Sequence, residues 1–148
     1  MLQLNVKTLV VYDSAYGNTA KIAEAIAEGL GTKALHISKF KIEYLKSLKL
    51  LVVGSPIQGW RPLEGMNQWL DAFSGSQLKN IKVTSFDTRM KVFFHGDASL
   101  KILGRLVDKG GSKLVDPKVF FVKGKEGPLF DGEMERAVEW GKELGKTL

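Results

Sequence analysis

The sequence predicts an α/β protein in which helices cover both faces of one parallel sheet, a three-layer arrangement. Short apolar segments alternate five times with segments of helical periodicity, and this alternation is typical of consecutive βαβ units. The 148 residues are 44% hydrophobic and 26% charged, a balance that suits one globular domain over residues 1–148 with a sizeable core. No internal repeat or long linker divides the sequence.

Five strands are expected from apolar segments that are too short for helices and rich in β-branched residues and leucine. They fall at residues 6–12, 34–37, 49–53, 81–86 and 118–122. Gly54 is expected to close the third strand. A less regular stretch, residues 87–97, follows the fourth strand and is expected to be a loop.

Helical segments are expected after each of these strands. The first, residues 19–30, places Ile22, Ile26 and Leu30 on one stripe and stops at Gly31. The others are expected over residues 42–48, from Pro62 at a first helical position to Phe73, over residues 99–108, and after Asp131.

The last helix carries two further signals. Asp131 is expected to cap it, and Glu133 and Glu135 suit the positive end of its dipole. Gly141 and Gly145, four residues apart, would let this helix lie close to a neighbouring helix.

Composition excludes several kinds of site. The chain has no cysteine and only two histidines, which excludes disulfides, thiolate metal sites and a cysteine nucleophile. We therefore expect no metal site and no catalytic residues, so that redox chemistry would need a bound organic cofactor. No apolar stretch approaches the length of a membrane span and no secretory signal is evident, so we expect a cytoplasmic protein.

The net positive charge of the chain favours anionic partners. Lysine and arginine number 22 against 16 acidic residues, which gives a net charge of +6. The lysines are scattered rather than grouped with aromatic residues, so nucleic acid is not the expected partner. An acidic redox partner protein is the partner that this charge favours, and the oligomeric state stays open.

The loop that follows the first strand, residues 13–19, has the features of a phosphate site. Unpaired N–H groups and partial positive charge at the start of a helix attract anions. The loop contains no lysine or arginine and lacks the glycine patterns of nucleoside triphosphate and dinucleotide sites. The sequence therefore predicts a site for one terminal phosphate, held by uncharged donors.

This loop resembles the segment with which flavodoxins grip the ribityl phosphate of FMN. The resemblance is carried by Ser14, Ala15, Tyr16, Gly17, Asn18 and Thr19. It implies a flavodoxin-like fold with a five-stranded parallel sheet in the order 2-1-3-4-5, and FMN as the cofactor. A helix cap in an ordinary tight turn is the simpler interpretation of the same residues.

The segment after the third strand resembles the flavodoxin loop that wraps the isoalloxazine ring. By this resemblance the cofactor-binding residues include Ser55, Pro56, Ile57, Gln58, Gly59 and Trp60. Trp60 would stack on the flavin, and the Gly59 peptide would turn to meet flavin N5. The alternative for Trp60 is a partly buried hydrophobic cap.

The same resemblance places the residues after the fourth strand at the pyrimidine end of the flavin. Asp87 and Thr88 would hydrogen-bond the imide edge, and Arg89 would lie near N1 and O2. A salt-bridged surface Arg89 is the alternative. Familiar flavodoxins have a tyrosine in this loop that this sequence lacks, and Phe93 or Phe94 would have to replace it.

The chain also departs from the family in charge, because familiar flavodoxins are strongly acidic around the flavin. Here Arg61 and Arg89 flank the predicted site. Nearby positive charge stabilises the negative charge that a flavin gains on reduction. We expect a less negative reduction potential than that of an acidic flavodoxin, and a redox titration that finds an equally low potential would contradict this.

An FMN-binding electron carrier is the function that these loops favour, since the flavin carries the chemistry. The alternative is a small FMN-dependent oxidoreductase that acts on a quinone or a porphyrinogen-like substrate. A cofactor-free interaction module of the same fold is a further alternative. A phosphorelay receiver would need clustered acidic residues after the first strand, and a hydrolase of this topology would need GxSxG; neither pattern is present.

Overall fold

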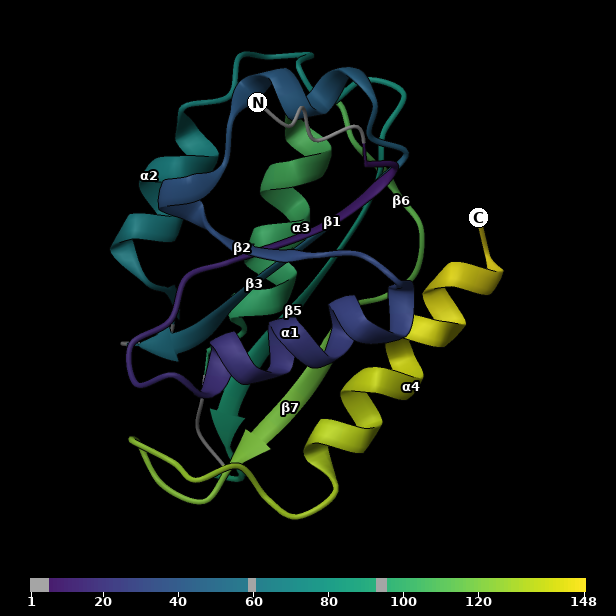
Figure 1. Ribbon diagram of the computed structural model, residues 1–148. Helices are drawn as coiled ribbons and strands as arrows, with labels where there is room; N and C mark the ends of the chain where they lie inside the picture. Colours follow the sequence, from purple (N-terminus) through teal and green to yellow (C-terminus); the bar gives the residue numbers. More distant parts are fainter. Residues whose placement is uncertain (1–5, 59–60, 93–95) are drawn as a thin grey trace.

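One parallel sheet forms the centre of the protein in the computed structural model, which describes residues 6–58, 61–92 and 96–148 (Figure 1). Four strands lie in the order β2 (Ala34–His36), β1 (Thr8–Tyr12), β3 (Leu50–Gln58) and β5 (Lys82–Met90). The fifth position is shared by β6 (Ser112–Lys113) and β7 (Lys118–Val122), which both pair with β5 in parallel. The predicted parallel sheet and its strand order are confirmed.

The described residues form seven strands rather than five, for two local reasons. A two-residue strand, β4 (Arg61–Pro62), pairs antiparallel with the end of β3. The fifth strand is split into β6 and β7, and Pro117, which has no N–H to donate to a ladder, lies in the interruption. Neither feature changes the five positions of the sheet.

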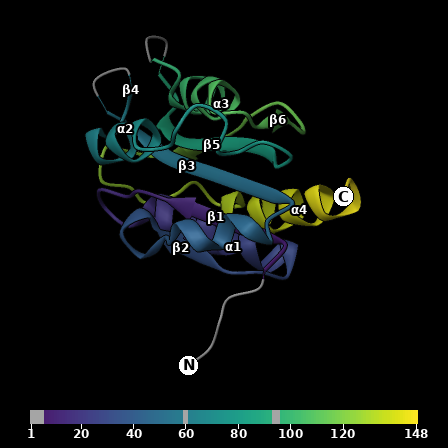
Figure 2. The ribbon, with the colours of Figure 1, turned by 90° about the horizontal axis from the view of Figure 1, so that it is seen from above.

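Helices cover both faces of the sheet, as the view from above shows (Figure 2). They are α1 (Asn18–Leu30), α2 (Glu64–Asp71), α3 (Ala98–Asp108) and α4 (Glu133–Lys146). α1 and α4 lie on one face, and α2 and α3 lie on the other. Alternate strand residues enter the two cores: Leu9 packs on the α2 and α3 side, and Val10 on the α1 and α4 side.

Two strands are longer than predicted, and this moves candidate residues from loops into the sheet. β3 continues past Gly54, and β5 continues past Phe86, because each supplies the other with hydrogen bonds as far as Pro56 and Thr88. Pro56 is tolerated there because β1 ends opposite Gly54, so this part of β3 has only β5 beside it in the parallel sheet.

Three predicted helices differ from the structure, one in its type and two in where they start. The segment expected as a helix over residues 42–48 is a 3-10 helix, Ile42–Lys46. Pro62 belongs to the short strand β4 rather than to a helix, and α2 starts two residues later, after Leu63. Asp131 does not cap α4, because Gly132 takes that position with a φ of 89°.

α1 and α4 cross at very close range. A Cβ atom added to Gly29 would lie 2.1 Å from the carbonyl oxygen of Val138, and one added to Gly141 would lie 2.2 Å from that of Ile26. The predicted close approach is confirmed at Gly141. At Gly145 the gap is wider, because an added Cβ would meet nothing nearer than 3.9 Å.

Gly31 ends α1 in the left-handed conformation, with a φ of 72°, as the sequence predicts. Within the described part of the chain, no helix combines the length and apolar character needed to cross a membrane.

Candidate functional site

A pocket of about 230 Å³ opens at the carboxyl ends of the central strands. The arrowheads of β3, β5 and β7 mark these ends at the lower left of Figure 1. Parallel strands all end at this edge, and ligands of such sheets bind there, next to the position where strand order reverses. The pocket is lined by Ala15, Tyr16, Asn18, Thr19, Pro56, Ile57, Thr88, Arg89, Met90, Val92, Gly96, Val122 and Lys125. Residues from all three predicted loops therefore meet at one place.

The start of α1 forms one wall and is open to an anion. Gly17 precedes the helix with a φ of 91°, and no side chain caps the helix. The N–H groups of residues 18–20 have no acceptor within the described residues. Ser14 Oγ accepts a hydrogen bond from Gly17 N at 3.1 Å and so shapes the turn. Free N–H groups at a helix start suit a phosphate group.

A buried pair of hydroxyls ties this wall to the sheet. Thr19 Oγ1 lies 2.8 Å from Thr88 Oγ1, and both side chains are almost fully buried. Thr19 belongs to α1 and Thr88 to β5, so the hydrogen bond fixes the start of the helix against the end of the strand.

The loop between β7 and α4 also reaches the pocket. Asn18 Nδ2 donates to the carbonyl of Glu126 at 3.1 Å, and Gly127 packs so closely on Asn18 that an added Cβ would lie 2.7 Å from Nδ2. This contact brings Lys125 into the lining. Lys125 could not be predicted as a site residue, because the loop that carries it is only polar and glycine-rich and nothing in the sequence spacing links this loop to α1.

Asp87 and Arg89 form a buried ion pair. Asp87 is fully buried and accepts hydrogen bonds from Arg89 Nε and from Ser99 N, each at 2.8 Å. Asp97 Oδ1 lies 3.3 Å from the same guanidinium. Burial disfavours the charge of Arg89, but the hydrogen bond and charge of Asp87, with those of Asp97, outweigh this and raise the pKa of the guanidinium above its ordinary value.

The ion pair changes the interpretation of both residues. Arg89 lines the pocket, but its charge is matched by two carboxylates. Asp87 is not among the lining residues, because its carboxylate is bound to Arg89 and to the start of α3. The salt bridge weighed as an alternative is present, in a buried rather than a surface position.

Several other predicted residues lie beside the pocket rather than in its lining. Ser55 is buried, donates to the Pro56 carbonyl and accepts from Leu63 N at 3.0 Å, so it joins the end of β3 to the start of α2. Ser14, Gly17 and Gln58 are also outside the lining. Gly59 and Trp60, like Phe93 and Phe94, lie outside the described residues.

The remaining lining is largely apolar and unusually exposed. Tyr16 is 47% exposed, and Met90 and Val92 are also exposed. Pro56 and Ile57 line the pocket from β3. An exposed apolar lining beside an anion site suits a ligand that has a flat apolar ring at one end and an anionic group at the other.

The comparisons with known proteins agree with this architecture. The family model described as Flavodoxin matches residues 10–140. Among curated proteins, no sequence matches the chain.

Solved structures resemble the chain over almost its whole length. A flavodoxin from the domain Archaea matches with a TM-score of 0.76 and 20% identity, covering 95% of this chain and 97% of that one. Oxidised Flavodoxin 2 from Bacillus cereus matches with a TM-score of 0.81 and 19% identity, covering 97% and 100%. A flavodoxin, WrbA-like protein from Agrobacterium tumefaciens matches with 0.77 and 20%, covering 94% of each. At such identities the likeness shows the fold.

Proposed function

Because this chain belongs to the flavodoxin family of FMN-binding electron-transfer proteins, we propose that it holds FMN in the pocket at the carboxyl ends of β1, β3 and β5. The observation that carries this proposal is the uncapped start of α1, which opens into the pocket beside Thr19. The phosphate would lie there, bound by the free N–H groups of residues 18–20 and by the hydroxyl groups of Ser14 and Thr19.

Lys125 adds a charge that the phosphate site was not expected to have. A phosphate dianion beside an ammonium group gains a charge-assisted interaction, which is about twice as strong as one between neutral groups. The site is therefore no longer purely neutral. Arg61, which was expected to flank the site, lies outside the pocket lining, and the charge of Arg89 is matched by Asp87 and Asp97. The expected rise in reduction potential therefore depends on Lys125.

The flavin ring would lie against the apolar part of the lining. Tyr16, Pro56, Ile57 and Met90 offer apolar surface that excludes water from the ring. Thr88 lies near the end of β5. Its hydroxyl group is hydrogen-bonded to that of Thr19 and can still make a second hydrogen bond, to the flavin ring. Bound FMN supplies the redox chemistry by taking up and releasing electrons, while these residues bind and orient it.

We further propose an acidic protein as the redox partner. Lys91, Lys123 and Lys125 lie near the pocket at the carboxyl edge, and all three are exposed. Lys91 Nζ is held 4.5 Å from the ring centre of Phe130 and 5.1 Å from that of Phe121. Charges placed around a redox site steer an oppositely charged partner and raise the rate of association.

Thr19→Val tests the phosphate site. Loss of a hydrogen bond to a charged group costs about 1.5–3 kcal/mol, so the Kd for FMN should rise about tenfold to a hundredfold. The Kd for riboflavin, which has no phosphate, should change far less. Fluorescence titration of both flavins measures the ratio.

Thr88→Val is the matched control, because it breaks the same hydroxyl pair but leaves the Thr19 hydroxyl in place. It should leave the ratio of the two dissociation constants close to that of the unmodified protein. If Thr19→Val also left this ratio unchanged, the Thr19 hydroxyl would not bind the phosphate.

Lys125→Gln tests the added charge. The Kd for FMN should rise about tenfold at low salt and show a weaker dependence on salt, because an ion pair with the phosphate is lost. Lys123→Gln removes the same charge two residues away, from a side chain outside the lining, and should change the Kd much less. Equal effects of the two variants would show that only net charge matters. Titration across a range of salt concentrations provides the measurement.

A further inference from the structure

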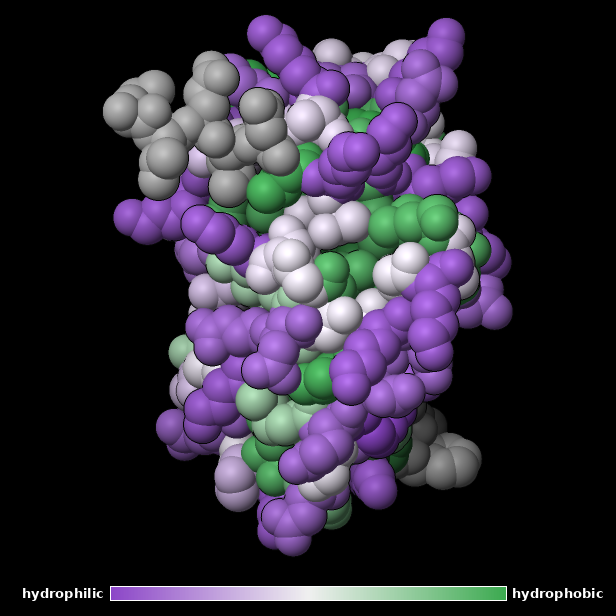
Figure 3. Space-filling view, turned by 45° about the vertical axis from the view of Figure 1, so that its right-hand side comes forward, coloured by the Kyte–Doolittle hydropathy of each residue, from purple (hydrophilic) through white to green (hydrophobic). Residues whose placement is uncertain are grey.

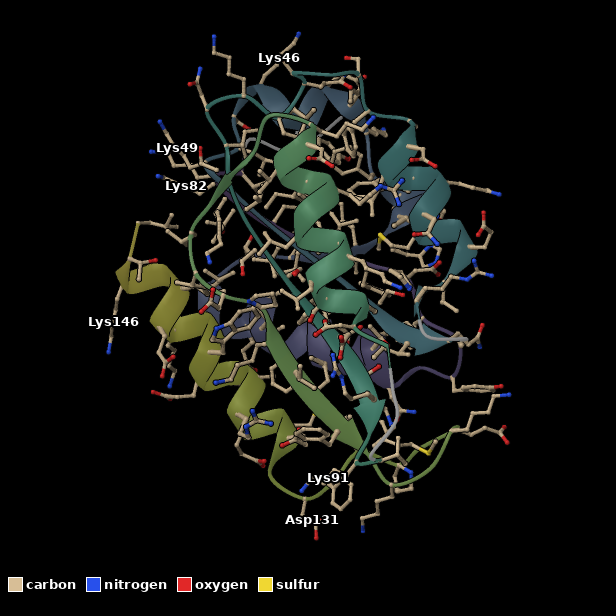
Figure 4. All side chains as sticks on the ribbon, turned by 180° about the vertical axis from the view of Figure 1, so that it is seen from behind. Lys46, Lys49, Lys82, Lys91, Asp131 and Lys146 are labelled. Carbon is tan, nitrogen blue, oxygen red and sulfur yellow. The ribbon has the colours of Figure 1, made fainter. Side chains whose placement is uncertain are left out.

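Exposed lysines gather at the amino edge of the sheet, the end opposite the pocket. Four of them precede or begin the neighbouring strands β2, β1, β3 and β5, and two come from the helical layers. We call them the amino-edge lysines: Lys7, Lys33, Lys46, Lys49, Lys82 and Lys146. Figure 4 shows Lys46, Lys49, Lys82 and Lys146 projecting along one side, while Lys91 and Asp131 lie at the other end.

The sheet topology brings these residues together. Parallel strands all begin at one edge, and neighbouring strands lie about 4.8 Å apart. Lys49 N donates to the carbonyl of Lys7 at 2.7 Å, and Lys82 N donates to that of Lys49 at 2.9 Å. The cluster is therefore created by strand pairing, and in the sequence the same lysines are widely scattered.

The charge of the cluster is not matched by acidic side chains. In the part of the chain that the structure describes, the amino-edge lysines form no salt bridge. Other lysines of this end are engaged: Lys113 Nζ pairs with Asp116 Oδ1, and Lys109 Nζ donates to the Phe73 carbonyl at 2.6 Å. Like charges this close repel one another, so a polyanionic surface would relieve the repulsion.

The composition of the amino edge distinguishes a lipid surface from a protein partner. Protein interfaces are enriched in arginine and aromatic residues and depleted in lysine, whereas this patch consists of lysines. Tyr16, the one aromatic side chain among the exposed large hydrophobic residues of the described chain, lies at the pocket instead. Figure 3 shows one side of the molecule that is mostly hydrophilic, with hydrophobic residues in separate patches.

We propose that the amino edge docks the protein on a membrane surface rich in anionic lipids. The amino-edge lysines come from the sheet and from elements on both of its faces, so they form a broad end that suits a planar surface. Clusters of four to eight basic residues bind such surfaces through charge alone. Docking by this edge would turn the cofactor pocket away from the bilayer and leave it open to a redox partner.

Vesicle binding of the full chain, saturated with FMN, tests this proposal. Sedimentation should show binding to phosphatidylcholine vesicles that contain phosphatidylglycerol, little binding to phosphatidylcholine alone, and release at high salt. The triple variant Lys46→Gln, Lys49→Gln, Lys82→Gln should bind about a hundredfold more weakly, since each lysine contributes about fivefold. Its flavin absorption spectrum should match that of the unmodified protein.

The matched control removes three exposed lysines that are not at the amino edge: Lys21→Gln, Lys39→Gln, Lys123→Gln. It lowers the net charge equally and should bind vesicles within a few-fold of the unmodified protein. Equal losses in the two triple variants would overturn the proposal, as would absence of binding to anionic vesicles. Retention on poly(U) RNA without vesicle binding would point to nucleic acid instead and would also overturn it. None of these outcomes depends on where FMN binds.

Discussion

Gly141→Ala is expected to lower the free energy of unfolding by about 3 kcal/mol or more, the largest effect that we predict for a single methyl group. The new Cβ would lie 2.2 Å from the Ile26 carbonyl oxygen and 3.0 Å from Gly29 Cα. Both contacts are with backbone atoms, so no side chain can rotate to make room. Only separation of α1 from α4 relieves the overlap, and this would open the core that both helices cover. Urea unfolding followed by circular dichroism measures the loss.

Gly145→Ala is the matched control on the same helix. Its Cβ would meet only Leu30 Cδ2, at an ordinary contact distance of 3.9 Å. Alanine favours a helix over glycine by about 1 kcal/mol, so this variant should be as stable as the unmodified protein or slightly more stable. Gly29→Ala, from the other side of the crossing, should reproduce the loss seen at Gly141. If Gly141→Ala and Gly145→Ala behaved alike, the close crossing would not be the cause.

Asp87→Asn is expected to destabilise the protein by about 3 kcal/mol, because it leaves a buried guanidinium without its main partner. Arg89 is 8% exposed and Asp87 is fully buried. The amide group would also place a donor against Arg89 or Ser99 N, where two donors now meet a carboxylate. The free energy of unfolding from a urea titration measures the effect.

Two comparisons isolate the ion pair. Asp97→Asn should cost less than about 1 kcal/mol, because Asp97 is partly exposed, its contact with Arg89 is longer than that of Asp87, and an asparagine still accepts the cap hydrogen bond from Leu100 N. The double variant Asp87→Leu, Arg89→Met should recover much of the stability, since apolar residues often replace a buried ion pair without loss. A cost for Asp87→Asn no larger than for Asp97→Asn would contradict the role assigned to the buried pair.

The positions and types of most elements could be predicted from local sequence. A run such as residues 118–122 is apolar, short and bounded by polar residues, and β7 has the same bounds. Gly31 ends α1 because a residue in the left-handed conformation is needed there. The ends of β3 and β5 were predicted too early, because Ser55 and Asp87 are held in the sheet by each other's strand rather than by a local preference.

One part of the candidate site could be predicted from local sequence, and another part could not. The open start of α1 is a local property, which a glycine, a small loop and a helical pattern are enough to predict. The ion pair of Arg89 joins residues only two apart on β5, but its burial is not a local property, because the start of α3 covers the pair and donates to Asp87 from Ser99 N.

The sequence by itself determined the layered α/β fold, through the period of its apolar residues. The resemblance of its first loop to that of flavodoxins predicted the strand order, and the backbone chemistry of the same loop predicted a phosphate site there. Only the tertiary structure decided that Asp87 and Arg89 bind each other, that Lys125 reaches the pocket, and that scattered lysines share one edge. The physical reason is that Lys125 and the amino-edge lysines come from segments far apart in the chain, so strand pairing and helix packing set the distances between them. Asp87 and Arg89 are neighbours on β5, but Asp97 and Ser99, at the start of α3, complete and bury their ion pair.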